Sequence, residues 1–170
     1  MQLHALKREQ RVERPLARVF PFFERPENLA LITPPRLGFH LLTPSPVVME
    51  QGRIIDYTIR VMGARLRWRS LISTYRAPHC FVDEQLVGPY SFWHHTHTFE
   101  EAGVGTLLRD EVRYALPVLL PGPLAAAIHR WQVRPLLEQI FDYRQQQFQR
   151  LFGGGAAPGL VPGNPPAVES

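Results

Sequence analysis

The sequence predicts an α+β domain in which a curved antiparallel sheet of about seven strands wraps around one long C-terminal helix. The first observation behind this prediction is a run of six strand-like segments between residues 37 and 116, separated by short turns that contain glycine or proline. The second is a long amphipathic segment from Pro123 to about Phe152. Short connections between successive strands favour an antiparallel meander. A sheet that bends around a single helix leaves a space between the two, and we expect the functional site there.

The N-terminal segment predicts one further strand and two short helices. LHALKREQRVE alternates between mixed and uniformly charged positions, so we expect a strand that ends before Pro15, with Leu6 and Val12 facing the interior. PLARVFPFFE follows with apolar residues at helical spacing, and a proline in the first helical turn loses no useful hydrogen bond. A second short helix, PENLALIT, is predicted to begin at Pro26 and to end before the next prolines.

The remaining segments complete the predicted order of elements. We expect the later strands at 37–43, 53–62, 64–75, 80–88, 91–100 and 106–116. The apolar stripe of the long helix comprises Leu124, Ile128, Trp131, Leu137, Ile140, Phe141, Phe148 and Leu151. Pro135 lies inside this helix and is expected to kink it. Residues 1–152 are therefore predicted to form one domain, and the residues 153–170, rich in glycine and proline, a disordered tail.

Composition and charge argue against several classes of protein. The 170 residues are enough for one domain with a core, and they contain no apolar run long enough to span a membrane. The N-terminus lacks an apolar signal-peptide segment, and the single cysteine, Cys80, allows no internal disulfide, so we expect a cytoplasmic protein. The net charge is +4, but the densest basic group, RLRWR, alternates along a predicted strand. That pattern is more typical of the solvated face of a sheet than of a nucleic-acid-binding surface.

The stretch SFWHHTHTFE contains three of the seven histidines of the chain. Strand alternation places Trp93, His95 and His97 on one face and His94 on the other. The face with Trp93 is the more apolar, so we expect His95 and His97 to point into the interior and His94 into solvent. In the next strand the charged and apolar positions alternate in the same way, and this alternation turns Asp110 inward.

Five blocks of the sequence together resemble the helix-grip proteins of the START and SRPBCC superfamily. The blocks are REQ (8–10), PLARVFPFFERPENLALITPP (15–35), FVDEQLVGPYSFWHHTHTFE (81–100), GTLLRDEVRYALP (105–117) and IFDYR (140–144). The superfamily also contains birch-pollen-type allergens and aromatic polyketide cyclases, and within it the chain is most similar to bacterial ligand-binding SRPBCC domain proteins. The resemblance implies a helix-grip fold for residues 3–152. It implies no single biochemistry, because members bind lipids, hormones, quinones and polyketides and some catalyse cyclisation or hydrolysis.

The resemblance also implies that the first strand lies beside the last one, which would bring Arg8 to Asp110. If His97 opposes Leu108 across the hairpin, then His95 opposes Asp110. Arg8, His95, His97 and Asp110 would then form one polar corner of a cavity whose other walls are aromatic and aliphatic. Such a corner is costly for the fold unless its groups pair with one another or with water.

The polar corner allows four interpretations, which the sequence leaves open. Its side chains can simply satisfy one another, or they can anchor the polar group of a mainly apolar ligand. They can also catalyse a cyclisation or dehydration, with a histidine as general base and Arg8 stabilising an enolate. For a metal ion the corner lacks a further inward ligand, and Arg8 would repel the cation. The orientation of Asp83 is undetermined, because either Phe81 or Val82 can face the interior.

We therefore predict a protein that binds a hydrophobic small molecule, such as a lipid, quinone, isoprenoid or polyketide, in an internal cavity. We expect no cofactor, no metal, no nucleic-acid partner and no stable membrane insertion, and a binding protein rather than an enzyme. The alternatives are a cyclase- or dehydratase-type enzyme that uses His95, His97, Asp110 and Arg8, and an accessory domain of a sugar-nucleotide-epimerase-like protein partner. The predicted ligand-binding residues are Tyr57, Trp68, Trp93, His95, His97, Asp110, Tyr114 and Phe141.

Overall fold

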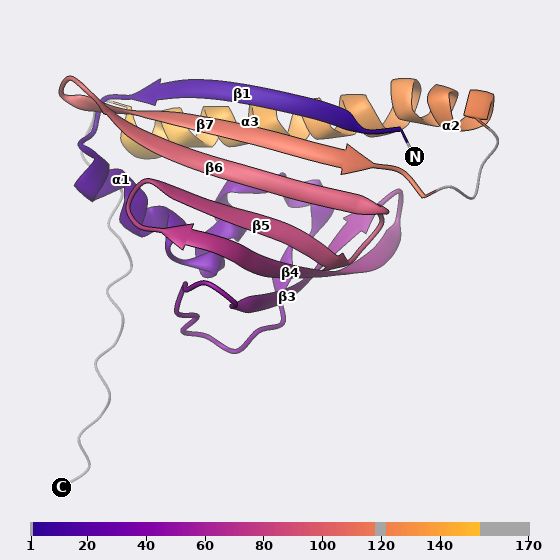
Figure 1. Ribbon diagram of the computed structural model, residues 1–170, viewed down its shortest axis with the longest axis horizontal. Coiled ribbons are helices and arrows are strands. Elements are labelled where there is room, and N and C mark those ends of the chain that lie inside the picture. Colours follow the sequence, from indigo (N-terminus) through magenta and orange to yellow (C-terminus); the bar gives the residue numbers. More distant parts are fainter. Residues whose placement is uncertain (1, 118–121, 154–170) are drawn as a thin grey trace, which may run out of the picture.

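The structure, a computed structural model, describes residues 2–117 and 122–153, which include one seven-stranded antiparallel sheet (Figure 1). The strands are β1 (His4–Val12), β2 (His40–Leu41), β3 (Ile54–Val61), β4 (Ala64–Arg76), β5 (Cys80–Val87), β6 (Phe92–Ala102) and β7 (Gly105–Ala115). Their order across the sheet is β1-β7-β6-β5-β4-β3-β2. The expected meander is confirmed, and so is the pairing of the first strand with the last.

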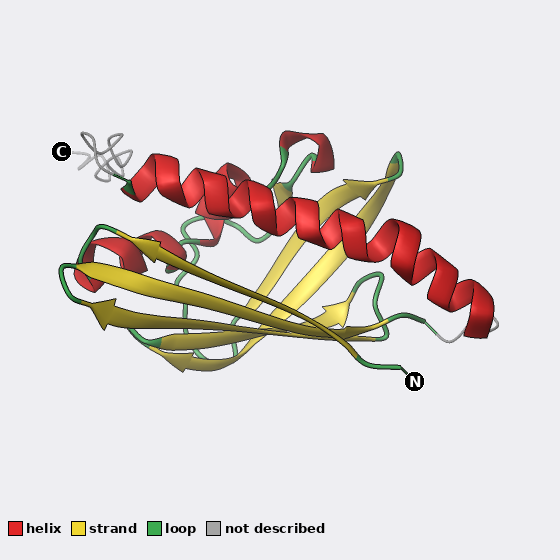
Figure 2. Cartoon of the chain, turned by 90° about the horizontal axis from the view of Figure 1, so that it is seen from above, coloured by secondary structure: helices red, strands yellow, loops and turns green. Residues whose placement is uncertain are grey.

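The helices lie on one side of this sheet. The helix α1 (Leu16–Phe23) and the 3₁₀ helices η1 (Pro26–Ile32) and η2 (Pro35–Leu37) connect β1 to β2. At the C-terminal end, α2 (Gly122–Ile128), the π-helical turn η3 (His129–Val133) and α3 (Arg134–Phe152) follow one another directly. Figure 2 shows this long helical segment crossing the sheet, with β3 and β4 turned away from β1, β6 and β7 beneath it.

The π-helical turn η3 ends just before Pro135, the proline that was expected to disturb the helix. Proline donates no backbone hydrogen bond and its ring crowds the preceding turn, so the regular hydrogen-bonding pattern changes there. None of the helices in the described part of the chain is long and apolar enough to cross a membrane.

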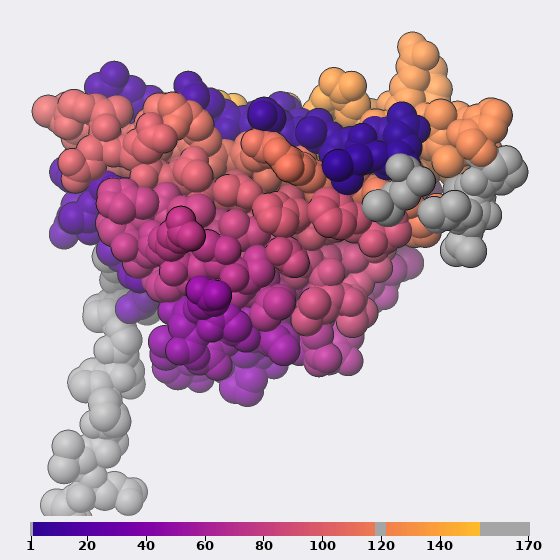
Figure 3. Space-filling view, in the orientation of Figure 1, coloured from indigo at the N-terminus to yellow at the C-terminus, as the bar shows by residue number. Residues whose placement is uncertain are grey.

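The outer face of the sheet is covered by polar and charged side chains. It is the face seen in the space-filling view, where β4, β5 and β6 form a continuous surface (Figure 3). Arg67 and Arg69 on β4 both bind the carboxylate of Asp56 on β3, at 3.2 and 2.9 Å. The basic RLRWR segment is therefore the solvated face of a strand, as its alternation predicts.

The apolar core fills one end of the space between sheet and helix. Phe20 of α1 packs edge-on against Phe99 of β6, with ring centroids 5.3 Å apart, and Phe22 packs against Phe148 and Phe152 of α3. These rings join the N-terminal helix, the sheet and the end of the long helix. Aromatic packing of this kind holds these three parts of the domain together.

The structure differs from the sequence-based expectations at three places. The segment 37–43 contributes only the two strand residues of β2, and the second short helix is a 3₁₀ helix. The apolar stripe of the long helix does not extend through its first turns, because α2 projects beyond the sheet (Figure 1). As a result Leu124 is 49% exposed. Trp131 on η3 is 72% exposed, whereas Leu137 is buried. The tail predicted at 153–170 lies, beyond Gly153, outside the described residues.

Candidate functional site

A cavity of about 720 Å³ lies between the concave face of the sheet and the long helix. Its walls are mainly aromatic and aliphatic side chains from β3, β4, β6, η1 and α3. Tyr57 and Trp68 stack with ring centroids 5.9 Å apart, and Trp93 meets Trp68 edge-on at 5.1 Å. A cavity of this size encloses most of a drug-sized molecule.

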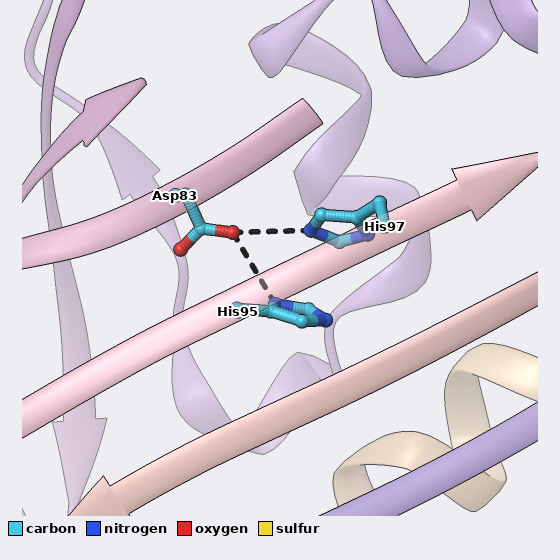
Figure 4. Close-up of side chains that lie close together, drawn as sticks. All are labelled: Asp83, His95 and His97. Carbon is cyan, nitrogen blue, oxygen red and sulfur yellow. Dashed lines mark hydrogen bonds and ion pairs between the residues drawn. The ribbon is translucent and has the colours of Figure 1, made fainter. Parts of the chain in front are cut away.

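Two buried histidines and two partly buried aspartates form a closed cluster on the concave face of the sheet, beside this cavity. Asp83 comes from β5, His95 and His97 from β6, and Asp110 from β7. Asp83 Oδ2 lies 3.3 Å from His95 Nδ1 and 3.0 Å from His97 Nε2. Asp110 Oδ1 lies 2.9 Å from His95 Nε2 and 2.8 Å from His97 Nδ1. Each imidazole therefore bridges the two carboxylates; Figure 4 shows one oxygen of Asp83 reaching both rings.

The registers of β5, β6 and β7 bring these four residues together. Asp83 pairs with His95 across β5 and β6, and His97 pairs with Asp110 across β6 and β7. Because alternate residues of a strand share a face, all four side chains point to the concave side. The histidines of this cluster are 4% and 7% exposed, whereas His94 points outward toward Glu84.

The predicted register of the β6–β7 hairpin is two residues off. His97 opposes Asp110, not Leu108, because the turn is the two-residue loop Gly103–Val104 between Ala102 and Gly105. Gly103 takes a positive φ of 63°, which suits glycine in such a tight turn. A shift of two residues preserves the face of every side chain, so the inward direction of His95, His97 and Asp110 is confirmed although their pairing is not.

The cluster is held together by opposite charges. Burial alone would raise the pKa of Asp83, but the facing imidazoles, through charge and hydrogen bonds, hold that pKa well below its usual range. The pKa of Asp110 is lowered for the same reasons. Burial alone would lower the pKa of His95, but the two carboxylates raise it above the ordinary value. The two carboxylates and His95 therefore stabilise one another's charged forms.

Trp68 and Arg144 carry buried N–H groups with no partner in the part of the chain that the structure describes. These groups are the indole N–H of Trp68 and the Nε of Arg144, and both residues line the cavity. Arg144 lies over the ring of Phe141, 4.9 Å from its centroid. Unpaired buried donors are rare in proteins and mark places where a ligand or a water molecule can bind. Tyr57 is a further polar group here, and its pKa is raised by burial and by the charge of Asp83.

The opening of the cavity lies between the β3–β4 hairpin and the helical segment around η3. Met62 at the hairpin and Trp131 on η3 line the cavity and are 85% and 72% exposed. Arg36 of η2 and Gln139 of α3 also line the cavity, and Arg36 donates a hydrogen bond of 2.6 Å to Gln139. Exposed apolar side chains around a cavity mouth are typical of a ligand entrance.

The structure brings most of the predicted site residues to one cavity, with exceptions. Tyr57, Trp68, Trp93, His95, His97 and Phe141 line its wall. Asp110 lies behind the histidines, and Tyr114 instead bonds His129 Nε2 at 2.9 Å, so neither is among the lining residues.

Arg8 does not join the polar cluster. Its backbone pairs with Asp110 as expected, but its guanidinium turns to Asp142 of α3, 3.3 Å away. The exposed carboxylate on the facing helix gives Arg8 a partner without burying its charge. The expected Arg8–Asp110 pair is therefore replaced by Arg8–Asp142.

Asp83 and Arg144 are the site residues that the sequence did not reveal. The strand CFVDEQLV contains apolar residues on both faces, so alternation alone does not orient Asp83. In the structure Phe81 and Asp83 point inward and line the cavity together. Asp83, His95 and His97 then present ligand atoms that all lie within 4.8 Å of one another, which makes them the candidate metal-binding group of the described residues.

Comparison with solved structures identifies the architecture. The Zhui aromatase/cyclase from Streptomyces sp. R1128 superposes with a TM-score of 0.66 at 15% identity, covering 94% of this chain and 100% of that chain. The chain has the helix-grip fold. A START superfamily protein from Mycobacterium smegmatis gives a TM-score of 0.63 at 12% identity, covering 87% and 99% of the two chains. The major latex-like protein 151 from Panax ginseng gives 0.61 at 10% identity, covering 88% and 97%.

These likenesses confirm the START/SRPBCC resemblance at the level of the fold. The sequence matches no family model and no curated protein. Helix-grip proteins with identities this low share an architecture, and function has to be argued from the site.

Proposed function

We propose that this helix-grip protein binds a small, mainly hydrophobic molecule with a polar end in the cavity between its sheet and its long helix. A lipid, a quinone, an isoprenoid or a polyketide is such a molecule. The observation that carries the proposal is the cavity of about 720 Å³. Its size falls within the range of small-molecule sites, and its aromatic walls favour an apolar body of the ligand through burial of apolar surface.

The unpaired donors support a polar or acidic end group on this ligand. Arg144 Nε and Trp68 Nε1 are buried beside the cavity without a described partner. A carboxylate, phenolate or carbonyl oxygen would accept hydrogen bonds from them, and such a bond to a charged group contributes about 1.5–3 kcal/mol. A ligand that lacks an acceptor would leave these donors unsatisfied.

A binding titration with a fluorescent probe tests the proposal. The probe 1-anilinonaphthalene-8-sulfonate has an aromatic body and an anionic end, and we expect one molecule to bind per chain. Leu66→Trp should weaken binding at least about 10-fold, because Leu66 lines the cavity and a larger side chain would narrow it. Arg65→Trp is the matched control, since Arg65 is exposed and the neighbouring position points to the other face. Equal affinity of both variants and the unchanged protein would refute binding in the cavity.

Arg144 provides a second test, directed at the polar end of the ligand. Arg144→Met should weaken binding of the anionic probe by about 10-fold or more, because it removes a charge-assisted hydrogen bond. Binding of the uncharged dye Nile red should change little. Arg150→Met is the control, because Arg150 lies exposed on the same helix. If the variants at 144 and 150 behave alike, Arg144 does not contact the ligand.

The His–Asp cluster favours one alternative, an enzyme of the cyclase or dehydratase type. His95 and His97 line the cavity, and each is oriented by carboxylates, as a general base requires. All four ring nitrogens already contact a carboxylate, however, so a histidine must first release one partner to accept a proton from a substrate. Turnover of a polyketide-like substrate that His97→Ala abolishes in a folded protein would favour the enzyme.

A further inference from the structure

We propose that Asp83, His95 and His97 form a binding site for one divalent transition-metal ion on the wall of the cavity. The site would use Asp83 Oδ2, His95 Nδ1 and His97 Nε2 as ligands. Two imidazoles and one carboxylate are the ligand set of catalytic zinc sites and of non-haem iron(II) sites. The proposal goes beyond binding of an organic ligand and does not depend on it.

The three ligand atoms have the spacing that a metal ion requires. Asp83 Oδ2 lies 3.3 Å from His95 Nδ1 and 3.0 Å from His97 Nε2. Metal–ligand bonds of about 2.0–2.1 Å at tetrahedral angles place neighbouring ligand atoms about 3.3 Å apart. The two nitrogens lie within 4.8 Å of each other, so the rings would have to close by at most about 1.5 Å. Both histidines are on one strand and their ring centroids are 3.7 Å apart, so small side-chain rotations suffice.

Asp110 occupies the position of an outer partner in such a site. It contacts His95 Nε2 and His97 Nδ1, the two nitrogens that the metal would leave free. Metal-bound histidines usually donate their second N–H to a carboxylate, which fixes the tautomer and the direction of the ring. One carboxylate serves both histidines here, and this arrangement distinguishes the cluster from an ordinary buried ion pair.

The charges of the cluster also suit a divalent ion. The charges of Asp83 and Asp110 are compensated by their contacts with the ring nitrogens of His95 and His97. A divalent cation would replace the protons on the two nitrogens that face Asp83, so the charge of the cluster would stay balanced. Trp93 donates its indole N–H to the other oxygen of Asp83 at 3.4 Å, which holds that carboxylate in place. Arg8, the cation expected to oppose a metal, binds Asp142 instead.

The three ligands face the cavity, whereas Asp110 lies behind them. Asp83, His95 and His97 all line the cavity, so the remaining coordination positions of the ion would open toward it. Three protein ligands with open positions are typical of a metal that also contacts a substrate or water. A bound organic molecule with an oxygen donor would then be able to reach the ion.

Cobalt and zinc binding to the chelator-treated full-length chain test this site. Co²⁺ is the spectroscopic probe, because three- or four-ligand nitrogen and oxygen sites give it visible absorption, and calorimetry with Zn²⁺ gives the stoichiometry. We expect one ion per chain. Asp83→Asn and His95→Gln should abolish the Co²⁺ absorption, and Asp110→Asn should weaken binding about 10–100-fold. His94→Gln is the matched control, since His94 lies on the same strand and points outward.

The outcomes separate a metal site from a merely structural cluster. Circular dichroism of each variant shows whether it is folded. The unchanged protein gives the number of metal ions bound per chain, and this result does not depend on whether the variants fold. Absence of stoichiometric Co²⁺ and Zn²⁺ binding at micromolar concentrations would overturn the proposal. An equal loss of metal binding in His94→Gln and His95→Gln would also overturn it, because it would indicate adventitious binding to surface histidines. Leu66→Trp should retain the metal while losing the organic probe, so the two proposals can fail separately.

Discussion

Asp110→Asn tests whether the buried cluster acts as one electrostatic unit. The substitution keeps the shape of the side chain and an oxygen acceptor but removes the charge that faces His95 and His97. Those contacts are 2.9 and 2.8 Å long, and the side chain of Asp110 is only 14% exposed. Removal of one partner from a buried charged pair costs about 3–5 kcal/mol, because the remaining charge is left uncompensated.

We expect Asp110→Asn to lower the free energy of unfolding by about 3 kcal/mol, the lower end of that range, because the amide oxygen can still accept hydrogen bonds. For a domain of this size such a loss corresponds to a decrease in Tm of about 6–12 °C. Urea unfolding followed by circular dichroism, in the presence of a chelator, gives the free energy directly.

Glu111→Gln is the control for this measurement. Glu111 is the next residue of β7 on the opposite face, where it pairs with Lys7 at 3.2 Å and is 31% exposed. Exposed ion pairs contribute about 0–1 kcal/mol, so this variant should remain close to the unchanged protein. If Asp110→Asn also costs less than about 1 kcal/mol, the four side chains are not coupled as the structure indicates.

Two further predictions concern packing and pH. Leu137→Ala should lower the free energy of unfolding by about 2–5 kcal/mol in urea, because Leu137 is buried between α3 and the sheet; a cost below about 1 kcal/mol would mean that α3 does not pack there. Burial lowers the pKa of His4 and of His129, whose rings stack 3.5 Å apart, below the ordinary value of 6.5. The unfolded chain then binds more protons below about pH 6.5, so this pair loses stability as the pH falls. The Tm of His129→Gln should therefore rise relative to that of the unchanged protein as the pH falls from about 7 to about 5. A difference in Tm that does not change with pH would contradict the lowered pKa values of this pair.

The architecture could be predicted because local patterns carry it. Alternation in SFWHHTHTFE orients its side chains whatever the neighbouring strand does, and turn residues mark most strand boundaries. The features that were predicted wrongly depend on contacts between residues that are far apart in the sequence. Trp131 has helical spacing with Leu137, but it is exposed at the edge of the cavity, although His129 in the same turn contacts Tyr114 and His4 of the sheet. Periodicity describes a helix face and contains no information on what covers it.

The candidate site could be predicted only in part, for a similar reason. The inward direction of His95 and His97 follows from the alternation of side chains along one strand, and it is confirmed. Asp83 belongs to a strand with apolar residues on both faces, so only its pairing with β6 reveals that it points inward. Arg8 faces two carboxylates, one across the sheet and one on α3, and the sequence does not tell which is within reach. Such choices are decided by tertiary packing.

Native mass spectrometry of the protein purified from its own host tests the central claim, that the cavity binds a small molecule. The account predicts a complex heavier than the chain by one organic molecule, larger than any metal ion, which denaturation releases and a hydrophobic probe displaces. Leu66→Trp, expressed and purified in the same way, should carry less of it, because the larger side chain takes up part of the cavity. A bare chain under gentle conditions that also takes up no hydrophobic probe would contradict the account.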